Sequence, residues 1–258
     1  YRRPCALVRE LLASGAKDLT LMSFTSGIES DLLVGAGRVS TVRSCYFGLE
    51  VFGLAPMFTR FASDGAIKII EETEATLAQG FAAKLNHLGF LPVQGLLGTD
   101  ILSVRPDLKV VTCPYTGARH VAVPALAPDV ALLHASMADE AGNVVLGGNL
   151  AADREIAMLA KKVIISVDRV VPREALPEGG VDLPLVGRDV MLVRAEGGAW
   201  PTSCHPHYGL DGGALLAYVV CAGMGAFDRY HSAFLEGRKA VEKIVSELEA
   251  MLPAEGKA

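Results

Sequence analysis

The chain has 258 residues, of which 51% are apolar and 6% aromatic, and its formal net charge at neutral pH is −5. A slightly acidic chain without a basic block lacks the electrostatic footprint of a nucleic-acid or anionic-membrane binder, so neither partner is expected. The length suits one large domain, and the apolar content indicates sheets buried on both faces and a surface that contacts another protein chain.

Helices and strands are predicted to alternate along the chain. The first helix is expected between Pro4, which suits a first helical turn, and Gly15, which suits the stop. Helical patterns of about 10 to 17 residues separate many of the later apolar runs, and such alternation indicates βαβ units. The predicted fold class is therefore α/β with a mainly parallel sheet. The strands are expected at 18–24, 39–47, 66–70, 109–115, 129–136, 162–171 and 190–196.

The stretch AIKIIEETEATLAQGF takes one of these strands directly into a helix. Thr73 is the expected N-cap of the helix and Gly89 its expected end. Glu74 falls within about 60° of every apolar position of the helix, so we expect it on the buried stripe. Glu74 either complements the helix dipole or acts as a partly desolvated nucleophile or base, and both interpretations stay open. The apolar positions are Leu77, Ala78, Phe81, Leu85 and Leu88.

Two later stretches carry further candidate binding residues. In GLLGTDI, Gly98 and Thr99 belong to a sharp turn, which is either an ordinary turn or a set of backbone N–H groups for a phosphate or an oxyanion. The stretch HASMADEAGNVVLGG begins at His134, which is interpreted as a buried core histidine before a catalytic one. Its residues 140–143 favour a β-turn between two strands.

The stretch SCHPHYGLD contains Cys204, His205 and His207 but fits no metal-binding pattern. Pro206 fixes an extended backbone, and neither a second Cys/His cluster at finger-like spacing nor an HExxH helix accompanies it. We therefore expect no metal and no tightly bound cofactor. The GxSxG, Walker and GxGxxG patterns are absent too, which argues against an α/β-hydrolase, a P-loop enzyme and a dinucleotide oxidoreductase.

The remaining sequence predicts a single domain over residues 1–258. A Pro- and Gly-rich segment at 171–187 is an expected excursion before the last strand, and the apolar segment 213–227 is a core helix too short for a membrane span. A terminal helix follows and loses its pattern after Pro253. The five cysteines are odd in number, scattered and without CxxC spacing, which indicates reduced thiols in a cytoplasmic protein.

Seven segments resemble, in the same order, the alpha (A) subunit of the family I CoA-transferases of the glutaconate CoA-transferase type. Six of them run from residue 2 to about 172, and the seventh, PTSCHPHYGLD, resembles the family segment after the last strand. The chain is also similar to the alpha subunit of the related two-subunit hydrolases that open the last steroid ring as a CoA thioester. The six are RRPCALVRELLASGAKDLTLMSF, LLVGAGRVSTV, LEVFGLAPMFTRF, GFLPVQGLLGTDI, LLHASMADEAGNVVLGG and EIAMLAKKVIISVDRVVP.

The resemblance implies a Rossmann-like open α/β/α sandwich that pairs with a beta (B) subunit in an α2β2 heterotetramer. The acyl-CoA site of that family lies between an alpha and a beta chain, and coenzyme A is a moiety of the substrate. The family chain begins with one more strand and a glycine-rich turn, which this sequence lacks at its start. In the transferases a glutamate of the beta chain attacks the thioester, and no match to its motif lies in these 258 residues.

The related hydrolases instead place a working glutamate on the alpha chain. Their pattern is an acidic residue, then Glu and Gly, a helix with a mid-helix glycine, and LPFLP. Here Glu74, Gly80 and LGFLP fall at corresponding spacings, although Ala75 replaces the glycine. Transferases more often carry Asn or His at the place of Glu74, so the resemblance favours Glu74 as a reagent.

The expected activity is transfer of CoA between an acyl-CoA thioester and a carboxylate, at a site shared with the beta chain. Gly98 and Thr99 would help to form the acyl pocket. The wall beside the pocket would be shaped by His134, Asp139 and Asn143.

Two alternatives stay open beside this activity. The first is hydrolytic carbon-carbon cleavage of a cyclic oxo-acyl-CoA, with Glu74 as general base. Burial on the apolar stripe would raise the pKa of Glu74 toward neutrality, which suits a base. The second alternative is a non-catalytic assembly subunit that only shapes the site of its partner.

Overall fold

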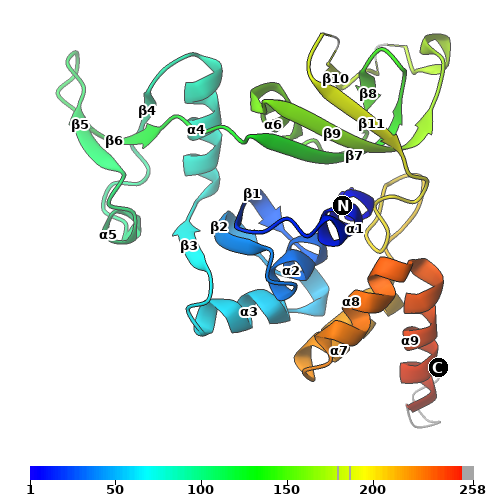
Figure 1. Cartoon of the computed structure of the whole chain (residues 1–258). Coiled ribbons are helices and arrows are strands. Elements are labelled where there is room, and N and C mark those ends of the chain that lie inside the picture. The colour runs from blue at the N-terminus through cyan, green and yellow to red at the C-terminus, as the bar shows by residue number, and fades with distance from the viewer. Residues whose placement is uncertain (179, 186, 252–258) are drawn as a thin grey trace.

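The computed structural model describes residues 1–178, 180–185 and 187–251, which form an α/β fold with three sheets (Figure 1). The predicted fold class is confirmed. Two of the sheets are built on parallel strands, and the third is antiparallel.

The first sheet consists of β1 (Leu19–Ser26), β2 (Val39–Phe47) and β3 (Lys68–Glu71), which run parallel in that order. All three coincide with strands predicted from apolar, β-branched runs. Because parallel strands end on the same side of a sheet, their carboxyl ends meet at one edge.

Helices cover both faces of the first sheet, as expected of an α/β/α sandwich. Leu21 and Met22, successive residues of β1, belong to two different apolar clusters, because neighbouring side chains of a strand point to opposite faces. The cluster of Leu21 includes Tyr218, and the cluster of Met22 includes Phe81. The first face carries α1 (Cys5–Ser14), α2 (Ile28–Gly35), α3 (Pro56–Ser63), α7 (Gly212–Gly223), α8 (Phe227–Glu236) and α9 (Arg238–Met251), and the second carries α4 (Glu74–Leu85) and α6 (Asp153–Leu159).

The second sheet has five strands, three of them parallel and long enough to bury a continuous apolar core. The predicted turn at 140–143 joins the first of these strands to a short antiparallel strand. The excursion at 171–187 adds the short helix η2 (Arg173–Ala175) and another antiparallel strand. In sheet order the strands are β10 (Leu183–Pro184), β8 (Asn143–Val145), β7 (Val130–Ala138), β9 (Lys162–Val170) and β11 (Val190–Arg194).

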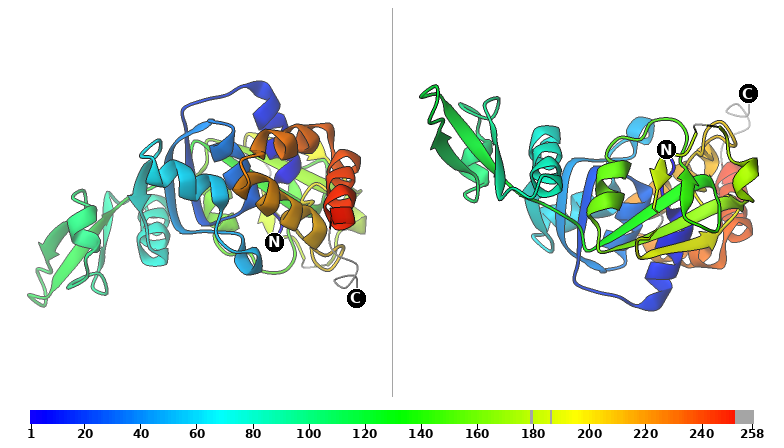
Figure 2. Two further views of the ribbon diagram at one scale, coloured as in Figure 1. Left: turned by 90° about the horizontal axis from the view of Figure 1, so that it is seen from below. Right: turned by 90° about the horizontal axis from the view of Figure 1, so that it is seen from above.

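The third sheet projects away from the rest of the protein in every view (Figure 2). It consists of β4 (Phe90–Val93), β6 (Arg119–Pro124) and β5 (Lys109–Thr112), paired antiparallel in that order, with the short helix α5 (Ile101–Val104) beside them. We name residues 90–124 the projecting unit. The sequence predicted β5 but neither its partners nor their antiparallel pairing.

Several helix ends differ from the expected ones. Helix α1 stops at Gly15 in a left-handed conformation (φ 75°), as predicted, because glycine adopts it without a Cβ clash. Helix α4 ends at Leu85 rather than Gly89. The segment 213–227 and the terminal helix are divided into α7, α8 and α9, the last two separated by Gly237 (φ 111°). The expected loss of pattern after Pro253 lies outside the described residues.

In the part of the chain that the structure describes, no helix is both long and apolar enough to cross a membrane. All five cysteines are free thiols, three of them buried.

Candidate active site at the edge of the first sheet

The carboxyl ends of β1, β2 and β3 lie side by side, at the edge where open parallel sheets bind their ligands. We name the surface formed by residues 25–27, 44–46 and 71–74 the β1–β3 edge. Strand register sets it, since Thr25 lies opposite Tyr46 and Ser44 lies opposite Glu71.

Glu72 is the buried carboxylate of this edge and is only 3% exposed. Arg43 Nε donates to Glu72 Oε1 at 2.9 Å, and Arg105 Nη1 lies 2.8 Å from Glu72 Oε2. Thr76 Oγ1 donates to the same Oε2 at 2.5 Å. A buried carboxylate that two guanidinium groups and a hydroxyl hold in this way is a fixed anchor rather than a free nucleophile.

Arg105 connects this anchor to the projecting unit. It follows α5 and also donates to the carbonyl oxygen of Glu71 at 2.7 Å and, through Nε and Nη2, to both carboxylate oxygens of Asp107. The Arg105 guanidinium lowers the pKa of Asp107. The projecting unit is thus attached to the end of β3 by charge-assisted hydrogen bonds.

Glu74 is the first residue of α4, directly after the predicted cap. Thr73 Oγ1 accepts from the N–H of Thr76 at 3.1 Å, and Thr76 Oγ1 accepts from the N–H of Thr73 at 2.8 Å, so the predicted N-cap is confirmed. The side chain of Glu74 is exposed, and the described contacts give it no ion pair or hydrogen bond. The prediction that Glu74 lies on the buried stripe is wrong.

The rotation of α4 explains this difference. Its buried residues include Gly80 and Ala83, and the mean direction of the buried set lies about 110° from Glu74. The segment that follows β6 draws this face inward: the N–H of Leu126 donates to the Gly80 carbonyl at 2.9 Å, and a Cβ on Gly80 would lie 3.1 Å from the Pro124 carbonyl oxygen. Glu74 is therefore free to meet a substrate or another chain.

Cys45, near the end of β2, is a residue of this edge that the sequence analysis did not single out. Its Sγ donates to the Phe24 carbonyl oxygen at 2.7 Å. Burial and the neighbouring carboxylate of Glu74 raise the pKa of the Cys45 thiol, which shows that Glu74 lies close to it. The position of Cys45 two residues before the end of a predicted strand was a usable signal.

Glu29 is a second buried carboxylate next to the edge, in the first turn of α2. Its Oε1 accepts from the N–H of Gly27 and the hydroxyl of Ser30, both at 3.0 Å, and lies 3.3 Å from Arg3 Nη1. Arg3 also donates to the carbonyl oxygen of Thr25. Like Glu72, Glu29 is paired with an arginine.

Gly98 and Thr99 lie in the projecting unit, in the turn before α5. Gly98 has a positive φ of 78°, and the N–H and hydroxyl of Thr99 both donate to the Leu96 carbonyl, at 3.4 and 2.8 Å. Both residues are exposed. The sharp turn is confirmed, and its role as a pocket for an acyl group stays a prediction.

Asp139 and Asn143 form a clasp across the turn between β7 and β8. The backbone N–H of Asn143 donates to Asp139 Oδ1 at 2.8 Å, and its Nδ2 donates to Oδ2 at 2.7 Å. Arg173 Nη1 lies 3.8 Å from the same Oδ2. The described contacts connect this clasp to neither Glu74 nor the projecting unit.

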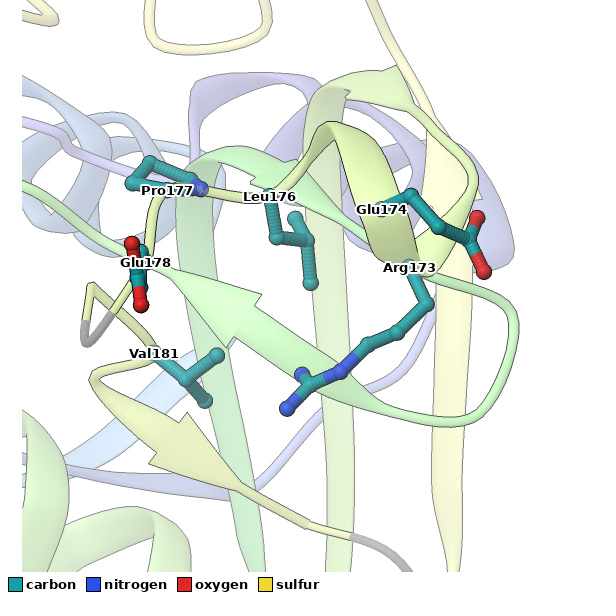
Figure 3. A pocket seen from close by; sticks show the side chains of 6 residues that line it. All are labelled: Arg173, Glu174, Leu176, Pro177, Glu178 and Val181. Carbon is teal, nitrogen blue, oxygen red and sulfur yellow. The ribbon is translucent and has the colours of Figure 1, made fainter.

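A cavity of about 410 Å³ adjoins this clasp through Arg173 (Figure 3). Leu176 and Val181 face the cavity, whereas the carboxylate of Glu174 is turned away. The cavity thus belongs to the excursion after β9 and not to the β1–β3 edge. Its lining residues are Arg173, Glu174, Leu176, Pro177, Glu178 and Val181.

His134 is buried between β7 and β9 and is 1% exposed, as the core interpretation expects. Its Nδ1 lies 2.9 Å from Ser166 Oγ, and its Nε2 lies 3.1 Å from Tyr208 Oη and 3.4 Å from Asp168 Oδ1. We name His134, Ser166, Asp168 and Tyr208 the imidazole network. A role for His134 in shaping an acyl pocket stays a prediction.

Known proteins similar to this chain cover most of its length. The family model described as coenzyme A transferase matches residues 1–191. The alpha (A) chain of 3-oxoadipate CoA-transferase from Pseudomonas knackmussii is 31% identical over 258 residues, which covers 98% of this chain and 89% of that protein. The cholesterol ring-cleaving hydrolase IpdA subunit of Mycobacterium tuberculosis is 33% identical over 254 residues, which covers 93% of this chain and 86% of that protein.

A solved structure supports the same relationship. The crystal structure of glutaconate coenzyme A-transferase from Acidaminococcus fermentans matches with a TM-score of 0.84 at 27% identity, covering 96% of this chain and 84% of that chain. The resemblance that seven sequence segments indicated is thereby confirmed, for the transferases and for the ring-cleaving hydrolases.

Proposed function

Because the chain belongs to the coenzyme A transferase family, we propose that it is the alpha (A) subunit of an enzyme that moves CoA between an acyl-CoA thioester and a carboxylate. The observation that carries the proposal is the match of 98% of the chain to the alpha chain of a CoA-transferase. Relatives named as one of two kinds of chain imply a beta partner, and the proposed assembly is an α2β2 heterotetramer.

The chemistry of the β1–β3 edge supports a site shared with that beta partner. Glu29 and Glu72 are buried and paired with arginines, so neither is available to attack a thioester. In the proposed reaction a glutamate of the beta chain attacks the thioester carbonyl and expels the CoA thiolate, which then attacks the resulting anhydride to give a glutamyl thioester and the free acid. An incoming carboxylate reverses these two steps and leaves as its CoA ester.

The proposed contribution of this chain is to bind and orient the acyl-CoA. Gly98 and Thr99 offer the turn of the projecting unit to the acyl group, and His134, Asp139 and Asn143 shape the second sheet beside it. Binding energy from the distant CoA moiety then accelerates the reaction at the thioester.

A second candidate function follows from the exposed position of Glu74. It is an unpaired carboxylate among the described residues, at the start of α4 and next to the thiol of Cys45, and the chain is 33% identical to part of a ring-cleaving hydrolase. In this function Glu74 takes a proton from water, the water attacks a ring carbonyl of a cyclic oxo-acyl-CoA, and a carbon-carbon bond opens.

The decisive experiment uses the complex purified through a tag on this chain. The complex is mixed with acyl-CoA and treated with borohydride or hydroxylamine, and the labelled peptide is identified by mass spectrometry. An adduct on a glutamate of the beta chain supports transfer. No adduct, together with loss of turnover in Glu74→Gln, supports hydrolysis, and Glu71→Gln is the matched control for a neighbouring exposed carboxylate.

Other outcomes of this experiment decide against both reactions for this chain. If Glu74→Gln and Glu74→Ala each leave turnover within about threefold, a change below about 1 kcal/mol in the barrier, Glu74 is not a reagent. If the residues of the proposed acyl pocket are equally tolerant, the chain is an assembly subunit. A chain that purifies without a partner and binds no pantetheine-bearing compound contradicts the proposal as a whole.

A further inference from the structure

Three potential metal ligands from distant parts of the sequence converge inside the protein. They are His134 of β7, Asp168 of β9 and Cys204 of the segment after β11, and one donor atom of each lies within 4.8 Å of the others. His134 is 1% exposed, Asp168 7% and Cys204 0%. An imidazole, a carboxylate and a thiol that share one buried point are a common ligand set of transition metals.

The hydrogen bonds of Ser166 orient the imidazole toward this point. Ser166 Oγ donates to the Leu133 carbonyl oxygen at 3.3 Å, so it accepts from His134 Nδ1 at 2.9 Å. The proton on Nδ1 leaves a lone pair on Nε2, which faces Asp168. A histidine that binds a metal through one nitrogen usually donates its other N–H to such an outer partner.

The point where these residues meet has more acceptors than donors. His134 Nε2 and Asp168 Oδ1 face each other at 3.4 Å, and the hydroxyl of Tyr208, at 3.1 and 3.4 Å, supplies one proton for both. Among the described residues, the buried Asp168 Oδ2 has no hydrogen-bond partner. The thiol of Cys204 is a weak donor and compensates little. A buried carboxylate with an unmet acceptor is costly, and a cation removes that cost.

We propose that His134, Asp168 and Cys204 bind a zinc ion, through Nε2, a carboxylate oxygen and Sγ, with a water molecule or Tyr208 Oη in the fourth position. Zn²⁺ accepts nitrogen, oxygen and sulfur ligands in a tetrahedral site, whereas Mg²⁺ and Ca²⁺ prefer oxygen alone. The ion would connect two strands of the second sheet to the segment that leads into α7.

This ligand set differs from the one that the sequence offered. The sequence placed His205 and His207 next to Cys204, but both histidines are exposed. Strand pairing instead brings His134 opposite Ser166, two residues before Asp168. The expectation of no metal considered neighbours in sequence, and the fold supplies other ligands.

A route to the site from solvent is present. Tyr208 and Gly197 line a cavity of about 740 Å³ together with Trp200 and Arg238. Tyr208 Oη contacts the imidazole network, and the N–H of Gly197 donates to Asp168 Oδ1 at 2.8 Å. A metal ion therefore needs to pass only one layer of side chains.

The test uses the whole chain without a histidine tag, stripped with a chelator and then equilibrated with Zn²⁺. We expect one zinc per chain by elemental mass spectrometry. Co²⁺ in place of Zn²⁺ is expected to give the absorption band of a thiolate-bound ion, and Cys204→Ser to abolish this band. Asp168→Asn and Ser166→Ala are each expected to weaken zinc binding by about tenfold or more, the latter because it removes the partner that orients the imidazole.

Matched variants control for nonspecific metal binding and for folding. His207→Gln removes an exposed histidine three residues from Cys204, and Cys221→Ser removes another buried thiol, so both should keep the zinc and the cobalt band. Circular dichroism checks that each variant folds, and Ser166→Ala replaces Cys204→Ser if the latter does not. No zinc above the stripped background, or a cobalt spectrum without the sulfur band, would overturn the proposal.

Discussion

The β1–β3 edge and the imidazole network gather similar side chains but meet solvent differently. At the edge, arginines hold Glu72 in place, while Glu74 two residues later is exposed and has no partner among the described residues. In the network, His134 and Asp168 are buried together. The edge thus combines a fixed anchor with a carboxylate that another molecule can reach, whereas the network encloses its polar groups.

This difference separates two meanings of an ionisable residue in the same fold. A group that is paired and buried contributes mainly to stability, and a group that is free at the end of a parallel strand can contribute to binding or catalysis. Stability and activity should therefore respond in opposite order to substitutions at the two kinds of position.

Arg105→Met is expected to have the largest effect on stability. It keeps the apolar stem but leaves Glu72 buried without one of its guanidinium partners, and it removes the donors to Asp107. We expect the free energy of unfolding in urea to fall by about 4 kcal/mol. Arg43→Met should cost less, because the side chain of Arg43 is 21% exposed and that of Arg105 4%. The exposed Arg119→Met is the control, and equal losses in all three variants would contradict the anchoring role of Glu72.

Asp31 sharpens the comparison, because it is a fully buried carboxylate without an arginine partner among the described residues. It accepts from the N–H groups of Met57 and Phe58 and from Tyr218 Oη, at 3.1, 2.6 and 2.6 Å. Burial raises its pKa from 3.8 to about 6. The folded state therefore binds a proton that the unfolded state releases, and the associated stability, present below the unfolded pKa, is lost as pH rises through about 6.

The shift of about two pKa units corresponds to about 3 kcal/mol of unfolding free energy. Asp31→Asn does not titrate, so its unfolding free energy should fall less than that of the parent between pH 4 and pH 7, by about this amount. Urea unfolding at several pH values measures the difference. The exposed Asp64→Asn should follow the parent, and a profile of Asp31→Asn that also follows it would exclude burial as the cause.

His134→Phe tests the imidazole network and is expected to have the next largest effect. In chelator-treated protein the change removes the imidazole partner of Ser166 Oγ and of Tyr208 Oη inside the core. We expect a loss of about 2 kcal/mol in thermal or urea unfolding. The exposed His207→Phe should change stability by less than about 0.5 kcal/mol. A tolerant His134 would show that the network adds little to the second sheet.

The sequence predicted the strands of the two parallel sheets well, because their β-branched runs are long and bounded by turns. It missed β4, which has four residues including Pro92, and β6, which begins with two polar residues, Arg119 and His120. Short antiparallel strands of this kind depend on pairing with one another more than on their own composition. The rotation of α4 was also beyond the helical pattern, since it follows from the close contact at Gly80 with a later segment.

The candidate site was predictable only in part. Reading the residues after each strand identified 71–74 and the neighbourhood of Thr25. The partners of Glu72 are 29 and 33 positions away, and the contacts of His134 with Asp168 and Tyr208 require the register of β7 and β9. Register is set by packing of the whole sheet, so no local pattern announces these contacts.

Glu74→Gln is expected to have the smallest effect on stability, and this completes the comparison. The side chain is exposed and unpaired among the described residues, so its removal loses only the favourable interaction of a carboxylate with the amino end of α4. That interaction contributes about 0.5 kcal/mol and is screened by salt. Urea unfolding at low and high salt measures it, with Glu71→Gln as the control outside the helix. A loss comparable to that of Arg105→Met would mean that Glu74 is a structural residue, and an unchanged stability with a large loss of turnover would separate its chemical role from its place in the fold.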